Sequence, residues 1–152
     1  MCDGMTIYHV MKALQDQYHF SGTLFDGWQG MQAVKLLPTE RKAVGASSIL
    51  SFDTKKINLE TFSDDCSLVK GSIPELLLPT EERLEVYWLY IDLDSETPTL
   101  AALNLFWDRT PRGGLVLFDD YLGELETKSV ADLFFADRAC VVLPFPTGQV
   151  FV

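Results

Sequence analysis

A chain of 152 residues has the length of one domain, because hydrophobic cores usually divide only beyond ~250 residues, so we expect a single domain over residues 1–152. Hydrophobic residues make up 47% of the chain and charged residues 22%, which is the balance of a globular protein and not of a disordered one. The net charge of -10 repels phosphate backbones and anionic lipid headgroups, so we expect neither nucleic acid nor a membrane surface as a partner.

The cysteines and the N-terminal residues bear on the compartment. Cys2, Cys66 and Cys140 are an odd, scattered set without metal-binding spacing, as expected for free thiols under reducing conditions. The first residues show no basic region followed by an apolar one, and the uncharged run near the helical segments, Thr97 to Trp107, is well short of the ~20 residues of a membrane span. The sequence therefore predicts a cytoplasmic protein.

Helical and strand patterns alternate along the first half of the chain. Ile7, Val10, Met11 and Leu14 recur at helical spacing and predict a helix, which leads into a short buried strand over 22–26. Turn residues and brief apolar patches alternate from 27 to 51, a pattern that predicts no single element. A second helix is expected over 54–62, followed by a strand over 66–70 and a helix start at Ser72 to Pro74.

The second half continues the alternation. Residues 84–92 are rich in aromatic and β-branched side chains, as in a central parallel strand. Thr97 and Pro98 predict the start of a helix that stops at Pro111, and a strand over 114–118 follows. After a further helix, strands over 139–143 and 149–152 should form an antiparallel pair. This order predicts an α/β fold, a three-layer α-β-α sandwich with a mostly parallel sheet.

Two of the predicted strands end in acidic residues. Asp92 and Asp94 end the strand over 84–92, and Asp119 and Asp120 end the strand over 114–118. The helix between them makes a parallel crossover unit, so the strands should be neighbours and the four carboxylates should converge. Like charges this close share protons or are offset by a cation, and carboxylate oxygens are the ligands of Mg2+, Ca2+ or Mn2+. We therefore expect a divalent metal ion.

Helix capping is the structural explanation of the same residues. Asp94 and Asp120 would then only cap the helices that follow them, which is a common role of Asp at a strand–helix junction. For one Asp alone that explanation would be preferred. Four at neighbouring strand ends favour a binding site, because capping requires no partner on the next strand.

A phosphatase is the second interpretation of the two acids Asp92 and Asp94. In haloacid-dehalogenase-type phosphatases the first Asp of such a motif is the nucleophile and the second a general acid. That family has Thr or Val two residues after the second Asp, whereas Glu96 stands there in this chain, and the motif lies in mid-chain instead of on the first strand. The phosphatase therefore ranks second.

A weaker signal indicates a nucleotide site. Asp26 ends the first strand some twenty residues after Asp3 and Gly4, the interval at which nucleotide-binding α/β domains place an acid on ribose hydroxyls. Gly71 and Ser72 follow the next strand and would lie beside the same crevice, where Gly71 would let a flat ring approach the backbone. An ordinary turn explains Gly71 equally well.

Four segments together resemble the macrocin O-methyltransferase (TylF-like) family. They are Phe25-Asp26-Gly27-Trp28-Gln29-Gly30, Leu68-Val69-Lys70-Gly71-Ser72, Ile91-Asp92-Leu93-Asp94 with Thr97, and residues 112–121 with Gly113-Gly114 and Asp119-Asp120-Tyr121. The resemblance implies a class I methyltransferase with a Rossmann-like sheet. It also implies S-adenosylmethionine and Mg2+ as cofactors, and a hydroxyl of a sugar or similar small molecule as acceptor.

The resemblance also implies a role for each matching residue. Asp92, Asp119 and Asp120 look like the metal ligands and Asp94 like the general base. Asp26 looks like the ribose ligand, with Gly71 and Ser72 near the adenine. Asp3 and Gly4 correspond to what remains of the Gly-rich cofactor loop.

The N-terminus departs from that family, because most of the first, central strand has no counterpart here. The gap would leave backbone groups of the flanking strands to be paired directly, by Met1 to Gly4, or by another copy, and we expect a homo-oligomer. A degenerate, non-catalytic domain of the same fold is a further alternative.

Overall fold

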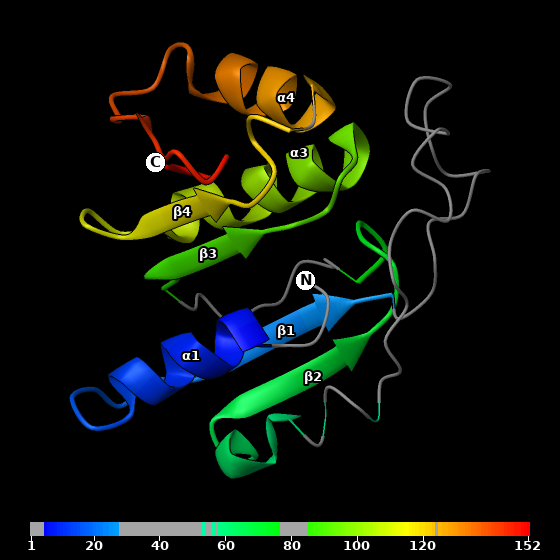
Figure 1. Ribbon diagram of the computed structural model, residues 1–152. Coiled ribbons are helices and arrows are strands. Elements are labelled where there is room, and N and C mark those ends of the chain that lie inside the picture. Colours follow the sequence, from blue (N-terminus) through cyan, green and yellow to red (C-terminus); the bar gives the residue numbers. More distant parts are fainter. Residues whose placement is uncertain (1–4, 28–52, 54–55, 57, 77–84, 124) are drawn as a thin grey trace. The chain divides into compact units, whose positions relative to one another are not determined.

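The computed structural model describes residues 5–27, 53, 56, 58–76, 85–123 and 125–152 (Figure 1). The chain divides into two compact units, Met1–Ser72 and Ile73–Val152. The described strands form two sheets, one with the order β1-β2 and one with the order β3-β4-β6-β5. The expectation of a single domain over 1–152 stays a prediction.

The first unit contains a helix against a pair of parallel strands. Helix α1 spans Met5–Leu14, and strands β1 (Gly22–Asp26) and β2 (Cys66–Lys70) pair in parallel over their whole length. Met11 is 1% exposed, and its Sδ lies 3.3 Å from where a Cβ of Gly22 would stand, so the glycine permits the helix to approach the strand closely. The predicted helix and both predicted strands are confirmed here.

The segments on either side of β2 differ from expectation or are only partly described. Of the helix predicted over 54–62, Lys56 and Asn58 are helical and Glu60–Phe62 forms the short 3-10 helix η3, whereas residues 54, 55 and 57 lie outside the described part of the chain. The helix start predicted at Ser72 to Pro74 is wrong, because residues 73–76 form turns. Proline fixes a φ angle that suits a turn as well as a first helical turn, so its presence could not distinguish the two.

The second unit is built on four strands. Strands β3 (Trp88–Ile91) and β4 (Leu115–Phe118) pair in parallel, and β6 (Val150–Phe151) pairs antiparallel with both β4 and β5 (Leu143–Pro144). The antiparallel C-terminal pair was predicted and is confirmed. Strands β3 and β5 are shorter than the predictions over 84–92 and 139–143. Apolar composition marked these runs as strand-like but could not tell how many of their residues find a pairing partner.

Three helical segments accompany this sheet: α3 (Glu96–Phe106), the 3-10 helix η4 (Trp107–Arg109) and α4 (Leu125–Phe135). The predicted cap at Thr97 is wrong, because Ser95 has the extended backbone of an N-cap, with φ -154° and ψ 142°. Pro98 then lies in the first helical turn, where amide groups have no partner within the helix and a missing N–H costs nothing.

One hydrophobic core joins β3, β4, β6, α3 and α4. Leu103, Val116, Phe118 and Val150 are completely buried, and the Trp107 ring meets those of α4 edge to face. The other buried members are Ile91, Tyr121, Val130, Ala131, Phe134 and Phe135. This core fixes the ends of β3 and β4 relative to the helices that follow them.

The Gly113-Gly114 pair has a structural role before β4. Gly113 has φ +89°, a conformation that favours glycine, and a Cβ on Gly114 would stand 2.7 Å from Thr110 Cγ2. Thr110 is itself held by a hydrogen bond from its hydroxyl to the Phe106 carbonyl, at 2.9 Å. The glycines therefore admit the tight connection from η4 into β4.

Parallel pairing brings the carboxyl ends of β3 and β4 to one edge of their sheet, with Ile91 opposite Phe118.

None of the described helices has the length and apolar character needed to cross a membrane. The predicted α/β fold class with a mostly parallel sheet is confirmed by these pairings.

Candidate functional site

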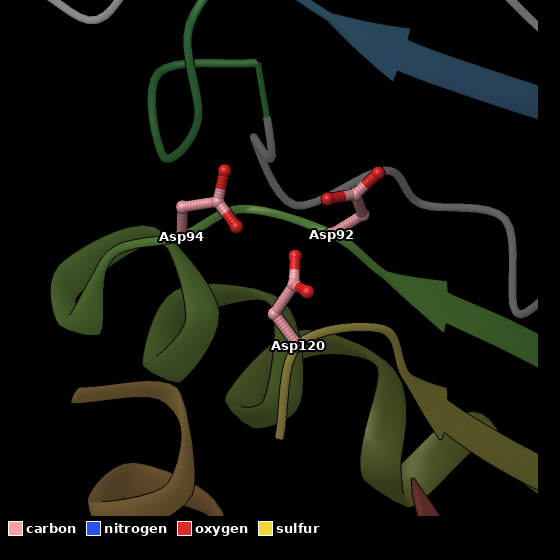
Figure 2. A group of neighbouring side chains, drawn as sticks. All are labelled: Asp92, Asp94 and Asp120. Atoms are coloured by element: carbon pink, nitrogen blue, oxygen red, sulfur yellow. The ribbon is translucent and has the colours of Figure 1, made fainter. Parts of the chain in front are cut away.

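Three carboxylates lie together at the ends of β3 and β4. Asp92 directly follows β3, Asp94 precedes the Ser95 cap of α3, and Asp120 follows β4. One ligand oxygen from each lies within 4.8 Å of those of the other two, and Figure 2 shows the side chains converging on one space. Asp92 and Asp94 are half-buried, whereas Asp120 is exposed.

Backbone pairing explains why these acids meet. The Asp119 amide donates a hydrogen bond to the Ile91 carbonyl at 3.0 Å, which extends the β3–β4 ladder by one residue. The residues that follow, Asp92 on one strand and Asp120 on the other, therefore leave the sheet side by side. Asp94 has a left-handed backbone conformation, with φ 47°, which Asp adopts more readily than most residues.

Capping does not account for Asp94 or Asp120. The N-cap of α3 is Ser95, and α4 begins at Leu125, five residues beyond Asp120. Helix capping therefore explains neither Asp94 nor Asp120. The amino-terminal end of α3, two residues beyond Asp94, carries a partial positive charge that offsets some of the repulsion among the carboxylates.

The donor set suits a hard divalent cation. Three carboxylates supply oxygen ligands, and the described part of the chain places no histidine or cysteine in the group. Such a set is the one that Mg2+, Ca2+ or Mn2+ prefers, since these ions bind oxygen rather than nitrogen or sulfur. The residues present therefore fit the predicted metal ion.

Asp119 is held differently from the other three acids. Its Oδ1 accepts a hydrogen bond of 2.6 Å from Nε2 of Gln149, and among the described residues it is not part of the three-carboxylate group. The expected convergence of all four carboxylates is therefore found for Asp92, Asp94 and Asp120 and not for Asp119. Sequence reasoning did not identify Gln149. Only the antiparallel register, with Phe118 opposite Val150, places Gln149 across from Asp119, and that register could not be seen in the sequence.

Tyr121 anchors the chain just after Asp120. Its ring is 7% exposed, its hydroxyl donates a hydrogen bond to Asp132, and Lys128 donates to both of them. Burial and the bond to Asp132 raise the pKa of Tyr121, whereas the hydrogen bonds from Lys128 and Tyr121 lower the pKa of Asp132. These hydrogen bonds tie Tyr121 to α4 and keep the backbone after Asp120 in place.

The predicted nucleotide residues of the first unit lie at neighbouring strand ends. Asp26 is the last residue of β1, and its carbonyl accepts a hydrogen bond of 3.0 Å from the amide of Gly71, which follows β2. Asp26, Gly71 and Ser72 are all half-buried. Asp3 and Gly4 lie outside the described residues.

The comparisons with known proteins point to one family. A methyltransferase domain family matches residues 1–121, which is most of the chain. The chain belongs to this methyltransferase domain family. The matched segment contains every predicted site residue, from Asp3 to Asp120, and it displaces the phosphatase interpretation. A search of the curated proteins gives no match.

Solved structures share the fold of this methyltransferase domain. The O-methyltransferase NovP is similar, with a TM-score of 0.80 and 19% identity, over 97% of this chain and 65% of that chain. CalS11, a calicheamicin methyltransferase, is similar with a TM-score of 0.70 and 15% identity, over 97% of this chain and 78% of that one. An apo structure of CalS11, named there as a TDP-rhamnose 3'-O-methyltransferase, has a TM-score of 0.59 and 14% identity, over 97% of this chain and 79% of that one. The chain thus spans less than two thirds of NovP.

Proposed function

We propose that this methyltransferase domain is an S-adenosylmethionine-dependent, divalent-metal-assisted O-methyltransferase of the macrocin O-methyltransferase (TylF-like) type. Its acceptor would be a hydroxyl of a sugar or a similar small molecule. The observation that carries the proposal is the group of three carboxylates, with ligand oxygens within 4.8 Å of one another, in a chain of the methyltransferase domain family.

Asp92, Asp119 and Asp120 are the proposed ligands of the metal ion, with Mg2+ as the first candidate. The position of Asp92 and Asp120 at adjacent strand ends and their oxygen donors support two of these ligands. Asp119 lies outside the three-carboxylate group, and its role is proposed from the family resemblance alone. A bound divalent ion lowers the pKa of a hydroxyl that it contacts.

Asp94 is the proposed general base. Its carboxylate oxygen lies within 4.8 Å of those of Asp92 and Asp120, so a hydroxyl held by those two residues and the ion would lie beside it. Asp94 would accept the proton from that hydroxyl oxygen, which makes the oxygen a competent nucleophile. The left-handed backbone at Asp94 and the adjacent N-terminus of α3 hold the carboxylate at this position.

The cofactor residues proposed for the first unit are Asp26, Gly71 and Ser72, with Asp3 and Gly4 from the N-terminal segment. The Asp26 carboxylate would accept hydrogen bonds from the two ribose hydroxyls, as acids at this position of α/β domains do. Gly71 and Ser72 would lie near the adenine. S-adenosylmethionine supplies a methyl group on a sulfonium centre, and the acidic chain does not oppose that positive charge.

The names of the structural neighbours support the acceptor class. One neighbour is named as a TDP-rhamnose 3'-O-methyltransferase, which places a sugar hydroxyl among the substrates of proteins with this fold. A glycoside acceptor, a cytoplasmic location and a homo-oligomeric state belong to the same proposal. The oligomeric state can be measured by sedimentation, for which a monomer would contradict the expectation.

Transfer of radiolabelled methyl groups from S-adenosylmethionine to a panel of free and nucleotide-linked sugars tests this function. The reaction should require added Mg2+ and stop with a chelator, and Asp94→Asn should abolish it. Ser67→Ala, an exposed substitution in β2, serves as the control.

Each alternative has its own outcome. Methyl transfer that continues unchanged in the presence of a chelator would contradict the metal ligands. Cofactor binding without transfer to any acceptor would favour the degenerate, non-catalytic domain. Release of phosphate from sugar phosphates would revive the phosphatase.

A further inference from the structure

The side chain of Gln149 connects the C-terminal turn to the acidic strand end. Its Nε2 donates a hydrogen bond to Asp119 Oδ1 at 2.6 Å, and its Oε1 accepts one from the Thr147 hydroxyl at 3.2 Å. A carboxylate can only accept hydrogen bonds, so the amide nitrogen must face Asp119. Both ends of the Gln149 amide are therefore used, and its orientation is defined.

Backbone hydrogen bonds fix the position of Gln149. The next residue, Val150, is completely buried and pairs with Phe118 of β4, so Gln149 lies opposite Asp119 in the same register. The Gln149 carbonyl accepts a hydrogen bond from Phe145 at 2.9 Å, and the Gly148 carbonyl accepts one from Leu122 at 2.9 Å. A turn held by backbone hydrogen bonds therefore positions the Gln149 side chain beside Asp119.

Gln149 restricts Asp119 at its side chain, and the sheet restricts it at its backbone. The Asp119 amide is bonded to the Ile91 carbonyl, so side-chain rotation is the freedom that remains, and the bond to Oδ1 removes it. A carboxylate has two oxygens, so this bond leaves Oδ2 for another partner. A neutral amide donor also orients the carboxylate without cancelling the charge that attracts a cation.

We propose that Gln149 is a positioning residue of the acidic site, acting on Asp119 with Thr147 as its support. The inference rests on the proposed metal-binding function of Asp119. Partners that hydrogen-bond the ligands of a metal ion commonly set the affinity for that ion. Gln149 also lies outside the segment, residues 1–121, that the methyltransferase domain family matches. The C-terminal turn would therefore set the Mg2+ affinity of a site whose acids lie within the matched segment.

Calorimetric titration with Mg2+ alone, without cofactor or acceptor, tests the inference independently of activity. Gln149→Met keeps the length of the side chain and removes the donor, and it should weaken Mg2+ binding by about tenfold. Gln17→Met, an exposed substitution just after α1, should leave binding unchanged. Equal affinity of Gln149→Met and the unaltered chain would overturn the inference.

A double-mutant cycle distinguishes positioning from a general loss of structure. If Gln149 acts through Asp119, adding Gln149→Met to Asp119→Ala should cause no further loss of affinity. A further tenfold loss in that background would overturn the inference, because Gln149 would then act by another route. Failure of the unaltered chain to bind Mg2+ at all would overturn both this inference and the proposed metal site.

Thr147→Val provides a second variant in case Gln149→Met does not fold. It removes the hydroxyl that fixes the amide and leaves the donor to Asp119 in place. A loss of Mg2+ affinity that is smaller than for Gln149→Met, and that disappears in the Asp119→Ala background, supports the inference. No loss in Thr147→Val contradicts the supporting role of Thr147.

Discussion

Asp120→Asn should stabilise the protein in the absence of divalent ions, because it removes one of three clustered charges. Each of the two neighbouring carboxylates has an oxygen within 4.8 Å of one on Asp120. At that distance and with the dielectric constant of water, repulsion costs about 0.9 kcal/mol for each pair. The exposure of Asp120 justifies the high dielectric constant. Loss of both pairs should therefore raise the free energy of unfolding by about 1.7 kcal/mol.

Divalent ions should reverse the order of stability. The unaltered chain should gain about 2.7 kcal/mol when Mg2+ is present at about 100 times its dissociation constant. Asp120→Asn lacks one ligand and should gain much less. Asp120→Asn should therefore be more stable than the unaltered chain in a chelator and less stable than it in Mg2+. An acid without a role in ion binding would not reverse the order of stability in this way.

Thermal unfolding in EDTA and in excess Mg2+ measures both effects. In EDTA, the expected stabilisation corresponds to a rise of about 3–7 °C in the melting temperature for a chain of this size. Asp64→Asn, an exposed substitution before β2, removes the same net charge outside the cluster and is the control. A lower melting temperature for Asp120→Asn in EDTA, or an equal Mg2+ effect in the variant and the unaltered chain, would refute the reasoning.

Three further substitutions test other parts of the account. Asp94→Asn should abolish turnover and leave S-adenosylmethionine affinity nearly unchanged, and an equal loss of affinity in calorimetry would contradict its role as base. Thr99→Val should raise the free energy of urea unfolding by about 1 kcal/mol, because the Thr99 hydroxyl is buried and has no hydrogen bond within the described residues; a loss of stability would contradict this. Asp132→Asn should destabilise the protein slightly near neutral pH. Because hydrogen bonds from Lys128 and Tyr121 lower the Asp132 pKa below its ordinary 3.8, that difference is present above 3.8 and should vanish as the pH falls through the lowered pKa. A difference that persists at lower pH would contradict this origin.

Local patterns were sufficient to predict the parallel crossover unit and the closeness of three of its four acids, although Asp119 was wrongly expected in the same group. A helix between two apolar runs makes the runs parallel neighbours, so acids that end both runs leave the sheet at the same edge. The closeness of Asp92, Asp94 and Asp120 follows from that rule together with the conformation at Asp94. The cap of α3 was misplaced, because Ser95 and Thr97 are both good capping residues and Pro98 is tolerated at more than one position of the first turn.

Long-range register could not be predicted in the same way. The contact between Gln149 and Asp119 joins residues 30 positions apart and depends on how β6 slides against β4. A shift of one residue would turn Gln149 away from Asp119, and nothing in the sequence of a two-residue strand selects between the alternatives. The side-chain orientation of Asp119 therefore could not be predicted from the sequence, although its position at the end of β4 could.

Titration of the full chain with S-adenosylmethionine by calorimetry tests the central claim most directly. The account predicts saturable binding at one site per chain. Asp26→Ala should weaken that binding by about 1.5 to 3 kcal/mol, or roughly tenfold to 150-fold, because it removes charge-assisted hydrogen bonds to the ribose hydroxyls. The claim would be contradicted if S-adenosylmethionine did not bind with or without Mg2+, or if Asp26→Ala bound it with the same affinity as the unaltered chain.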